Sequence, residues 1–75
     1  MTPILYEIPD KNMLSRRETD ILKQTIEGLA NKQIGVLLSI SEKTVKNHMA
    51  AIFVKFNVQS RTELTTKAFR AGLVT

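Results

Sequence analysis

The sequence contains no cysteine and only one histidine. The absence of cysteine excludes disulfide bonds and thiolate metal sites, so packing alone must stabilise the fold, and a reducing cytosol suits such a chain best. A single histidine cannot complete a zinc site of the usual kind. We therefore expect no metal and no cofactor, and we interpret His48 as a half-buried packing residue or a backbone contact.

Long apolar runs are also absent. No segment approaches the roughly 18 apolar residues that a membrane span requires, and the first ten residues lack the pattern of a secretory signal. We therefore expect a soluble, cytoplasmic protein with no membrane partner. The 75 residues have room for one modest core and none for a deep active-site cleft. With no paired carboxylates in an apolar setting and no glycine-rich phosphate loop, we expect no enzyme activity.

Charge is distributed unevenly along the chain. The net charge is +4, and 43% hydrophobic with 24% charged residues is typical of a folded globular domain. Residues 1–27 contain four basic and five acidic residues, whereas residues 28–75 contain seven basic and two acidic residues. The first segment is therefore −1 and the second +5. A basic segment of this density favours nucleic acid or another anionic surface as the partner.

Residues 1–13 are interpreted as a tail or linker that precedes one domain at residues 14–75. The segment contains two prolines and shows neither helical nor sustained alternating periodicity. Its apolar residues could dock on the domain or on another chain, and a short edge strand or a disordered segment is the alternative. These apolar residues are Ile4, Leu5, Tyr6 and Ile8.

Capping residues predict an all-α domain whose first two helices are short. Ser15 and Glu18 form a capping-box pattern that starts a helix at the next residue, and Gly28 supplies its left-handed end. A second helix is expected over residues 31–39, capped by Asn31 or a neighbouring residue.

Gly35 lies inside the second predicted helix, where a glycine weakens the helix slightly. We expect it to permit the close approach of another helix, because two backbones can cross at short range where a side chain is missing. A glycine that is tolerated without any packing role is the alternative.

Two further helices complete the predicted fold of four helices without strands. Ser41 is an N-cap for a helix that runs from Glu42 to Phe56, and Asn57 can adopt its left-handed stop. A second capping box starts the last helix, which Gly72 ends. This box is formed by Ser60 and Glu63.

The third predicted helix has two chemically different faces. At about 100° per residue, its apolar residues fall in one narrow stripe, whereas polar and small residues gather on the opposite side. The stripe contains Val45, Met49, Ile52 and Phe56; the opposite side contains Lys43, Lys46, Asn47 and Ala50. Lysine donates to guanine, asparagine pairs with adenine and alanine contacts the thymine methyl group, so this side has the chemistry of base readout. An ordinary solvated surface is the alternative.

A short helix, a tight turn and a longer helix with such a face form the pattern of a helix-turn-helix. In this motif, the first helix braces across the DNA backbone and the second enters the major groove. Lys32 begins the bracing helix. We therefore expect Lys32 to face phosphates.

The stretch from residue 14 to residue 74 resembles the LuxR/NarL-type helix-turn-helix domain of bacterial transcription regulators. The resemblance covers about four fifths of the chain, and its most specific block is ISEKTVKNH at residues 40–48. Other matches are LSRRETDIL at 14–22, NKQIG at 31–35, IFVKF at 52–56 and SRTEL at 60–64. The family usually has Ser, Glu, Ala and Leu where this chain has Ala30, Gln33, Gly35 and Phe56. These departures bear on the stability of the second helix more than on its role.

The resemblance implies roles for individual residues. The residues after the Thr-Val pair meet the bases in this family, which assigns base reading to Lys46, Asn47 and Ala50, and phosphate contact is implied for Asn31, Lys32, Lys43 and Thr44. The last helix commonly pairs two copies on DNA. This predicts a homodimer face of Leu64, Ala68 and Ala71, and inward packing of the first two is the alternative. RNA polymerase is a further implied partner.

The function expected from these patterns is sequence-specific binding of double-stranded DNA by a bacterial transcription regulator. We expect the helix from about Glu42 to Phe56 to enter the major groove, and we expect the protein to bind as a dimer. The alternative is a protein-interaction module of the same fold that modulates another regulator through the apolar residues 4–8.

Overall fold

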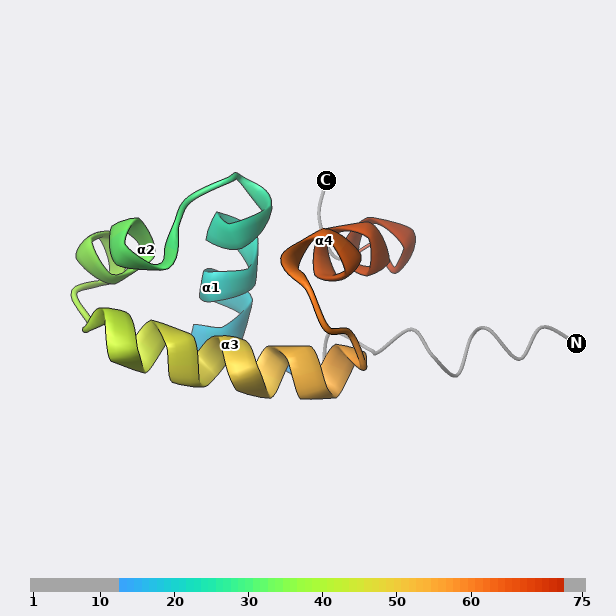
Figure 1. The fold of residues 1–75 in the computed structure, drawn as a ribbon, viewed down its shortest axis with the longest axis horizontal. Coiled ribbons are helices and arrows are strands. Elements are labelled where there is room, and N and C mark those ends of the chain that lie inside the picture. Colours follow the sequence, from blue (N-terminus) through green and yellow to red (C-terminus); the bar gives the residue numbers. More distant parts are fainter. Residues whose placement is uncertain (1–12, 73–75) are drawn as a thin grey trace, which may run out of the picture.

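The computed structural model describes residues 13–72, which form four α-helices and no strand. The helices are α1 (Arg16–Ile26), α2 (Asn31–Leu38), α3 (Glu42–Phe56) and α4 (Arg61–Arg70). In Figure 1, α3 is a long rod with α2 beside its first turns, α1 across its middle and α4 beside its last turns. The predicted all-α fold is confirmed. The predicted tail lies outside the described residues, except for Met13.

The first two helices begin in different ways. At α1 the predicted capping box is present, because the Ser15 Oγ accepts from the Glu18 backbone N–H at 3.1 Å and the Glu18 carboxylate accepts from the Ser15 N–H at 2.9 Å. The N-cap of α2 is Ala30, a neighbour of the predicted Asn31. Alanine has no side-chain acceptor. Within residues 13–72, the one side-chain bond at this cap runs from the Ala30 N–H to the Gln33 Oε1, at 2.8 Å. The N–H groups of the first turn of α2 therefore have no side-chain cap.

Gly35 makes the close approach that the sequence predicted, but to a turn. A Cβ atom added at Gly35 would lie 2.7 Å from the Ile40 carbonyl oxygen and 3.4 Å from the Glu42 backbone nitrogen. The Ile40 N–H also donates to the Gly35 carbonyl at 2.9 Å. The missing side chain thus lets the turn between α2 and α3 fold tightly onto α2.

An apolar stripe along α3 holds this helix in place. Val45, Ile52 and Phe56 have 0% exposure and Met49 has 5%. The stripe packs against core residues of the other three helices, namely Ile21, Leu22, Ile34, Leu64 and Ala68. Because burial of each large apolar side chain contributes about 1.5 to 3 kcal/mol, this contact fixes which side of α3 faces the protein. Within residues 13–72, no helix combines the length and apolar character that crossing a bilayer requires.

The contribution of α4 to this core corrects one prediction. Leu64 and Ala68 have 0% exposure and belong to the chain's own core, and Ala71 is half-buried. A partner cannot reach Leu64 and Ala68 while the fold is intact, so the prediction that they form a homodimer face was wrong. The alternative of inward packing is the one that the structure has. The exposed apolar residue of α4 is Phe69, at 57%.

Glu18 links the start of α1 to the end of α3. Its Oε1 accepts from the Lys55 Nζ at 2.7 Å, and the same ammonium donates to the Met13 carbonyl at 2.9 Å. Burial alone would raise the pKa of the Glu18 carboxyl, but the hydrogen bonds from Lys55 and Ser15, with the Lys55 charge, leave this pKa below its ordinary value of 4.5. The ionised carboxylate therefore stabilises the folded state.

Replacing Glu18 by Gln should lower the free energy of unfolding at pH 7 by about 1 to 2 kcal/mol, because Lys55 loses its charged acceptor. Since the pKa of Glu18 is lowered on folding, its contribution is complete above about pH 4.5 and is lost as the pH falls through the folded-state value. Urea unfolding across this range should show a smaller acid loss for Glu18→Gln than for the wild type. The control is Glu27→Gln, which changes an exposed carboxylate and should alter the free energy of unfolding at pH 7 by less than about 0.5 kcal/mol. Identical pH dependences for the wild type and Glu18→Gln would contradict this role.

Ser39 ends α2 in the left-handed region with φ 61°, and Asn57 ends α3 with φ 55°. The left-handed conformation costs more free energy for serine than for asparagine, which adopts it more readily. Ser39→Gly should therefore raise the free energy of unfolding by about 0.5 to 1 kcal/mol in urea titrations, whereas Asn57→Gly should change it by less than about 0.5 kcal/mol. A destabilised Ser39→Gly variant would show that the serine side chain contributes to the turn.

Candidate nucleic-acid interface

The side of α3 opposite the core is open to solvent. Lys43, Lys46, Asn47 and Ala50 are all exposed, whereas Thr44 is half-buried. The separation follows from the helical period, because burial of the stripe on one side turns these positions outward. The structure therefore brings the three predicted base-reading residues, Lys46, Asn47 and Ala50, onto one exposed surface.

One ion pair lies on this surface. The Lys46 Nζ is 3.7 Å from the Glu42 Oε2, and the two side chains are 63% and 47% exposed. An exposed pair at this spacing contributes little to stability, because water and salt screen it. The Lys46 ammonium can therefore exchange this partner for an acceptor on a ligand.

Ser41 fixes the first turn of α3. Its Oγ accepts from the Thr44 backbone N–H at 3.0 Å and donates to the Thr44 Oγ1 at 2.8 Å. The predicted N-cap is confirmed, and Glu42 lies in the first turn, where the helix dipole favours a negative charge. The Thr44 hydroxyl accepts in this pair, so its own hydrogen remains available to an acceptor such as a phosphate.

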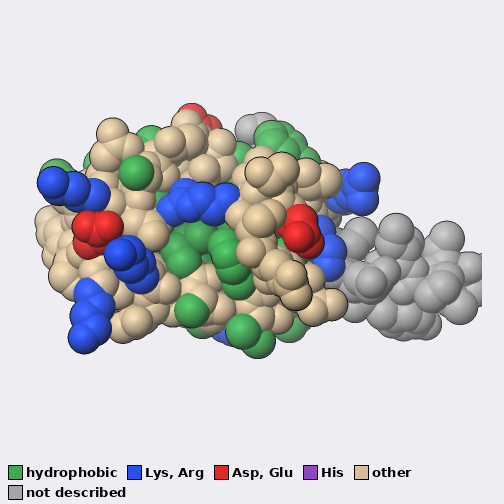
Figure 2. Space-filling view, in the orientation of Figure 1, with side chains coloured by type: hydrophobic (Ala, Val, Ile, Leu, Met, Phe, Trp, Pro, Cys, Tyr) green, Lys and Arg blue, Asp and Glu red, His purple; other side chains and the backbone are tan. Residues whose placement is uncertain are grey.

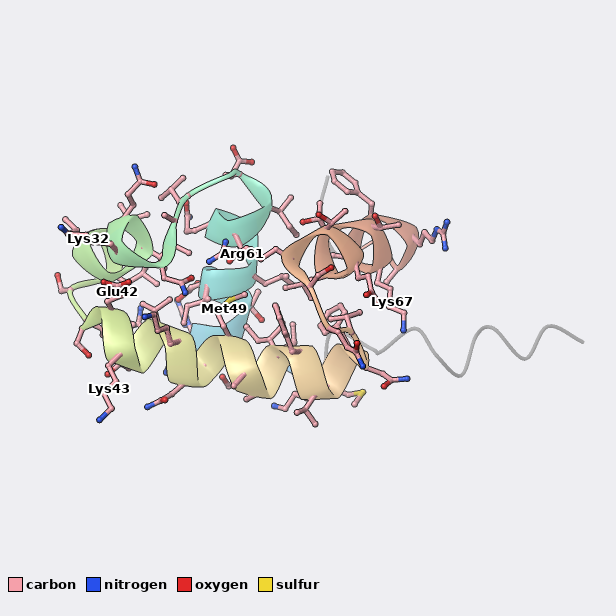
Figure 3. All side chains as sticks on the ribbon, in the orientation of Figure 1. Lys32, Glu42, Lys43, Met49, Arg61 and Lys67 are labelled. Atoms are coloured by element: carbon pink, nitrogen blue, oxygen red, sulfur yellow. The ribbon has the colours of Figure 1, made fainter. Side chains whose placement is uncertain are left out.

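Basic side chains gather at the end of the molecule where α2 meets the start of α3. Lys32 extends from α2 and Lys43 from α3, both away from the body of the protein (Figure 3). The space-filling view shows Lys and Arg side chains grouped around one acidic side chain at this end (Figure 2). Two helices thus contribute cations to one region, on either side of the turn between them.

A shallow groove of about 280 Å³ borders the exposed face of α3. Lys46 and Ala50 lie on one wall and Asn31 on another; Met49, Phe53 and Arg61 complete the lining. Figure 2 shows basic side-chain atoms across the hydrophobic hollow at the centre of this view, where Figure 3 labels Arg61. The groove brings one predicted phosphate contact, Asn31, next to two predicted base-reading residues.

Lys32 lies on a different surface from that groove. Together with Leu29, Gln33, Val36 and Leu37 it lines an apolar depression of about 410 Å³ on α2. Val36 is 77% exposed and Leu37 is 56% exposed. Lys32, a predicted phosphate contact, thus borders this apolar depression and not the groove beside Lys46.

Two residues of this region were not singled out from the sequence. Val54 is 80% exposed and lies one turn beyond Ala50 on the same side of α3. Because Val54 follows Ala50 by four residues, about one helical turn, the sequence pattern could have placed it on the exposed side. Arg61 belongs to the SRTEL motif, but no local pattern indicates that its guanidinium reaches Leu29 and Asn31.

His48 is half-buried and lies on α3. Its position agrees with the expected packing role. Among residues 13–72, no three His, Cys, Asp or Glu side chains are grouped so that they could hold a metal ion.

Comparison with known proteins assigns the domain to a family. The sequence model described as bacterial regulatory proteins, luxR family, matches residues 12–68. The chain belongs to the luxR family. The resemblance inferred from the motifs is thereby confirmed, and the domain is a helix-turn-helix domain of transcriptional regulators.

Several luxR-family proteins are similar over most of this chain. It is 43% identical over 63 residues to the transcriptional regulatory protein DegU of Brevibacillus brevis, covering 84% of this chain and 27% of that protein. It is 46% identical over 54 residues to the nitrate/nitrite response regulator protein NarP of Escherichia coli (strain K12), covering 72% and 25% respectively. The crystal structure of the response regulator ChrA of a heme-sensing two-component system superposes with a TM-score of 0.78 at 43% identity, covering 81% and 30%. The chain thus spans between 25% and 30% of the length of these proteins.

Substitutions on the exposed side of α3 should affect stability less than substitutions on its buried side. Lys46→Ala and Asn47→Ala should each change the free energy of unfolding by less than about 0.5 kcal/mol, because both side chains are exposed. Ile52→Val removes one buried methyl group and should cost about 0.5 to 1.5 kcal/mol. Urea unfolding monitored by circular dichroism measures all three. A loss above 1 kcal/mol for Asn47→Ala would indicate that this residue holds the fold rather than a ligand.

Proposed function

We propose that this domain binds double-stranded DNA sequence-specifically as part of a bacterial transcription regulator, with α3 in the major groove. The observation that carries the proposal is the exposed face of Lys46, Asn47 and Ala50 on a helix whose other side is buried. The major groove of B-DNA, about 12 Å wide, admits one α-helix. The two preceding elements, α2 and its tight turn, have the arrangement that braces such a helix across the backbone.

In the proposed complex, three side chains read bases. The Lys46 ammonium donates to guanine O6 and N7, and the Asn47 amide pairs with adenine N6 and N7. Ala50 contacts a thymine methyl group, and its small size lets the helix approach the bases closely. The exposed Val54 lies further along the same side and extends this apolar contact.

Phosphates supply most of the proposed affinity. Lys32 and Lys43 extend from the end where α2 meets α3 (Figure 3), and Asn31 and Thr44 lie at the first turns of these two helices. The first turn of α2 has no side-chain cap, so its N–H groups and the positive end of its dipole favour a phosphate there. Each contact between a lysine and a phosphate releases counterions from the DNA, so binding should weaken strongly as the salt concentration rises.

A homodimer on DNA is part of the proposal, although not through Leu64 and Ala68. Because Leu64 and Ala68 are buried, a second copy would contact the outer side of α4, where Phe69 is 57% exposed. Two copies would double the number of base contacts on a repeated site. We also propose that the regulator is cytoplasmic and contacts RNA polymerase.

A protein-interaction module of the same fold is the second candidate function. The contact first predicted for it, residues 4–8, lies outside the described residues. The described chain offers instead the apolar depression on α2, where Val36 and Leu37 are exposed. Salt separates the two functions, because DNA binding weakens steeply with ionic strength whereas an apolar contact changes little.

Selection of a binding site from random duplexes, followed by titrations at two salt concentrations, tests the proposal. Lys46→Ala should weaken binding to the selected duplex by about 1 to 3 kcal/mol and relax the preference at one position. Lys32→Ala should weaken selected and random duplexes alike and reduce the salt slope by about one. Equal losses on both duplexes for both variants would contradict these roles. The absence of any salt-dependent binding to DNA would contradict the proposed function.

A further inference from the structure

The start of α2 is anchored from outside the helix. Its N-cap, Ala30, has no side chain that could accept from the first turn. The residues on both sides of this cap, Leu29 and Asn31, are instead bound by Arg61, the first residue of α4. An anchor from another helix therefore holds the part of α2 that faces the groove beside Lys46.

The guanidinium of Arg61 makes two bonds with separate nitrogens. Its NH1 group donates to the Leu29 carbonyl at 3.2 Å, and its NH2 group donates to the Asn31 Oδ1. A guanidinium has no acceptor, so the Asn31 amide must present its oxygen to Arg61. The two hydrogens of the Asn31 Nδ2 are then left to donate elsewhere.

We propose that Arg61 is a positioning residue for DNA binding, which holds the Asn31 amide with its nitrogen free to donate to a DNA phosphate. Asn31 lines the groove that Lys46 and Ala50 border, so a DNA strand beside the base-reading face passes this amide. The inference rests on the proposed DNA-binding function and adds to it a residue outside the helix-turn-helix. This role requires the forked guanidinium of arginine, because it binds the Leu29 carbonyl and the Asn31 Oδ1 at the same time.

Binding of the full chain to the selected duplex, measured for Asn31→Ala, Arg61→Lys and the double variant, tests this inference. Lysine keeps the charge of Arg61 but lacks the fork. We expect each single variant to bind the duplex about tenfold more weakly, because each loses one hydrogen bond to a charged phosphate. The double variant should bind no more weakly than either single variant, because both changes remove the same contact. The salt slope of Arg61→Lys should remain that of the wild type.

Lys67→Ala is the matched control. Lys67 also lies on α4 and donates to a backbone carbonyl, that of Phe56, at 2.9 Å, but it does not line the groove. We expect this variant to change the urea midpoint and leave the affinity for the duplex unchanged. Every variant is tested at a temperature where circular dichroism shows it folded. If Arg61→Lys does not fold, the amide signals of the Asn31 side chain in the wild type replace it, and they should shift when DNA is added.

Several results would overturn the inference. Wild-type affinity of a folded Arg61→Lys variant would show that charge alone is sufficient, and additive losses in the double variant would show that Arg61 and Asn31 act separately. Asn31 side-chain signals that do not move on saturation with DNA would also contradict it. A wild-type chain that does not bind the duplex would overturn the proposed function together with the inference.

Discussion

The burial of one side of α3 is the constraint on which the rest of the structure depends. Four apolar residues of this helix face the core, namely Val45, Met49, Ile52 and Phe56. The helical period then determines which residues face solvent on the opposite side. Successive residues of a helix point about 100° apart. Burial of Val45 and Met49 therefore turns Lys46 and Asn47, which lie between them in the sequence, away from the core. Core packing and the proposed base reading are thus two consequences of one pattern in a single helix.

The other helices hold α3 at its ends and middle. Gly35 lets the turn before α3 fold against α2, and the ion pair of Glu18 with Lys55 ties the last turn of α3 to the start of α1. Arg61 connects the start of α4 to the loop before α2. These polar contacts contribute less than the core to stability, but they set the relative positions of the elements that border the exposed face.

Local patterns predicted the features that arise locally. Ser15, Ser41 and Asn57 act as caps or stops where the sequence placed them, and the apolar stripe of α3 is buried as its spacing indicated. The sequence was less informative where distant segments meet. Spacing alone could not decide whether Leu64 and Ala68 face the protein's own core or a partner, because a small apolar face suits either. The bond between Arg61 and Asn31 joins residues 30 positions apart, so no periodicity or cap could indicate it.

The most direct test of the central claim is a map of backbone amide signals during titration with a selected DNA duplex. If α3 enters the major groove, the largest changes should fall on Lys46, Asn47 and Ala50, while Val36 and Leu37 on the outer side of α2 stay near their free positions. Saturable binding that shifts Val36 and Leu37 and leaves the three α3 residues unmoved would contradict the account.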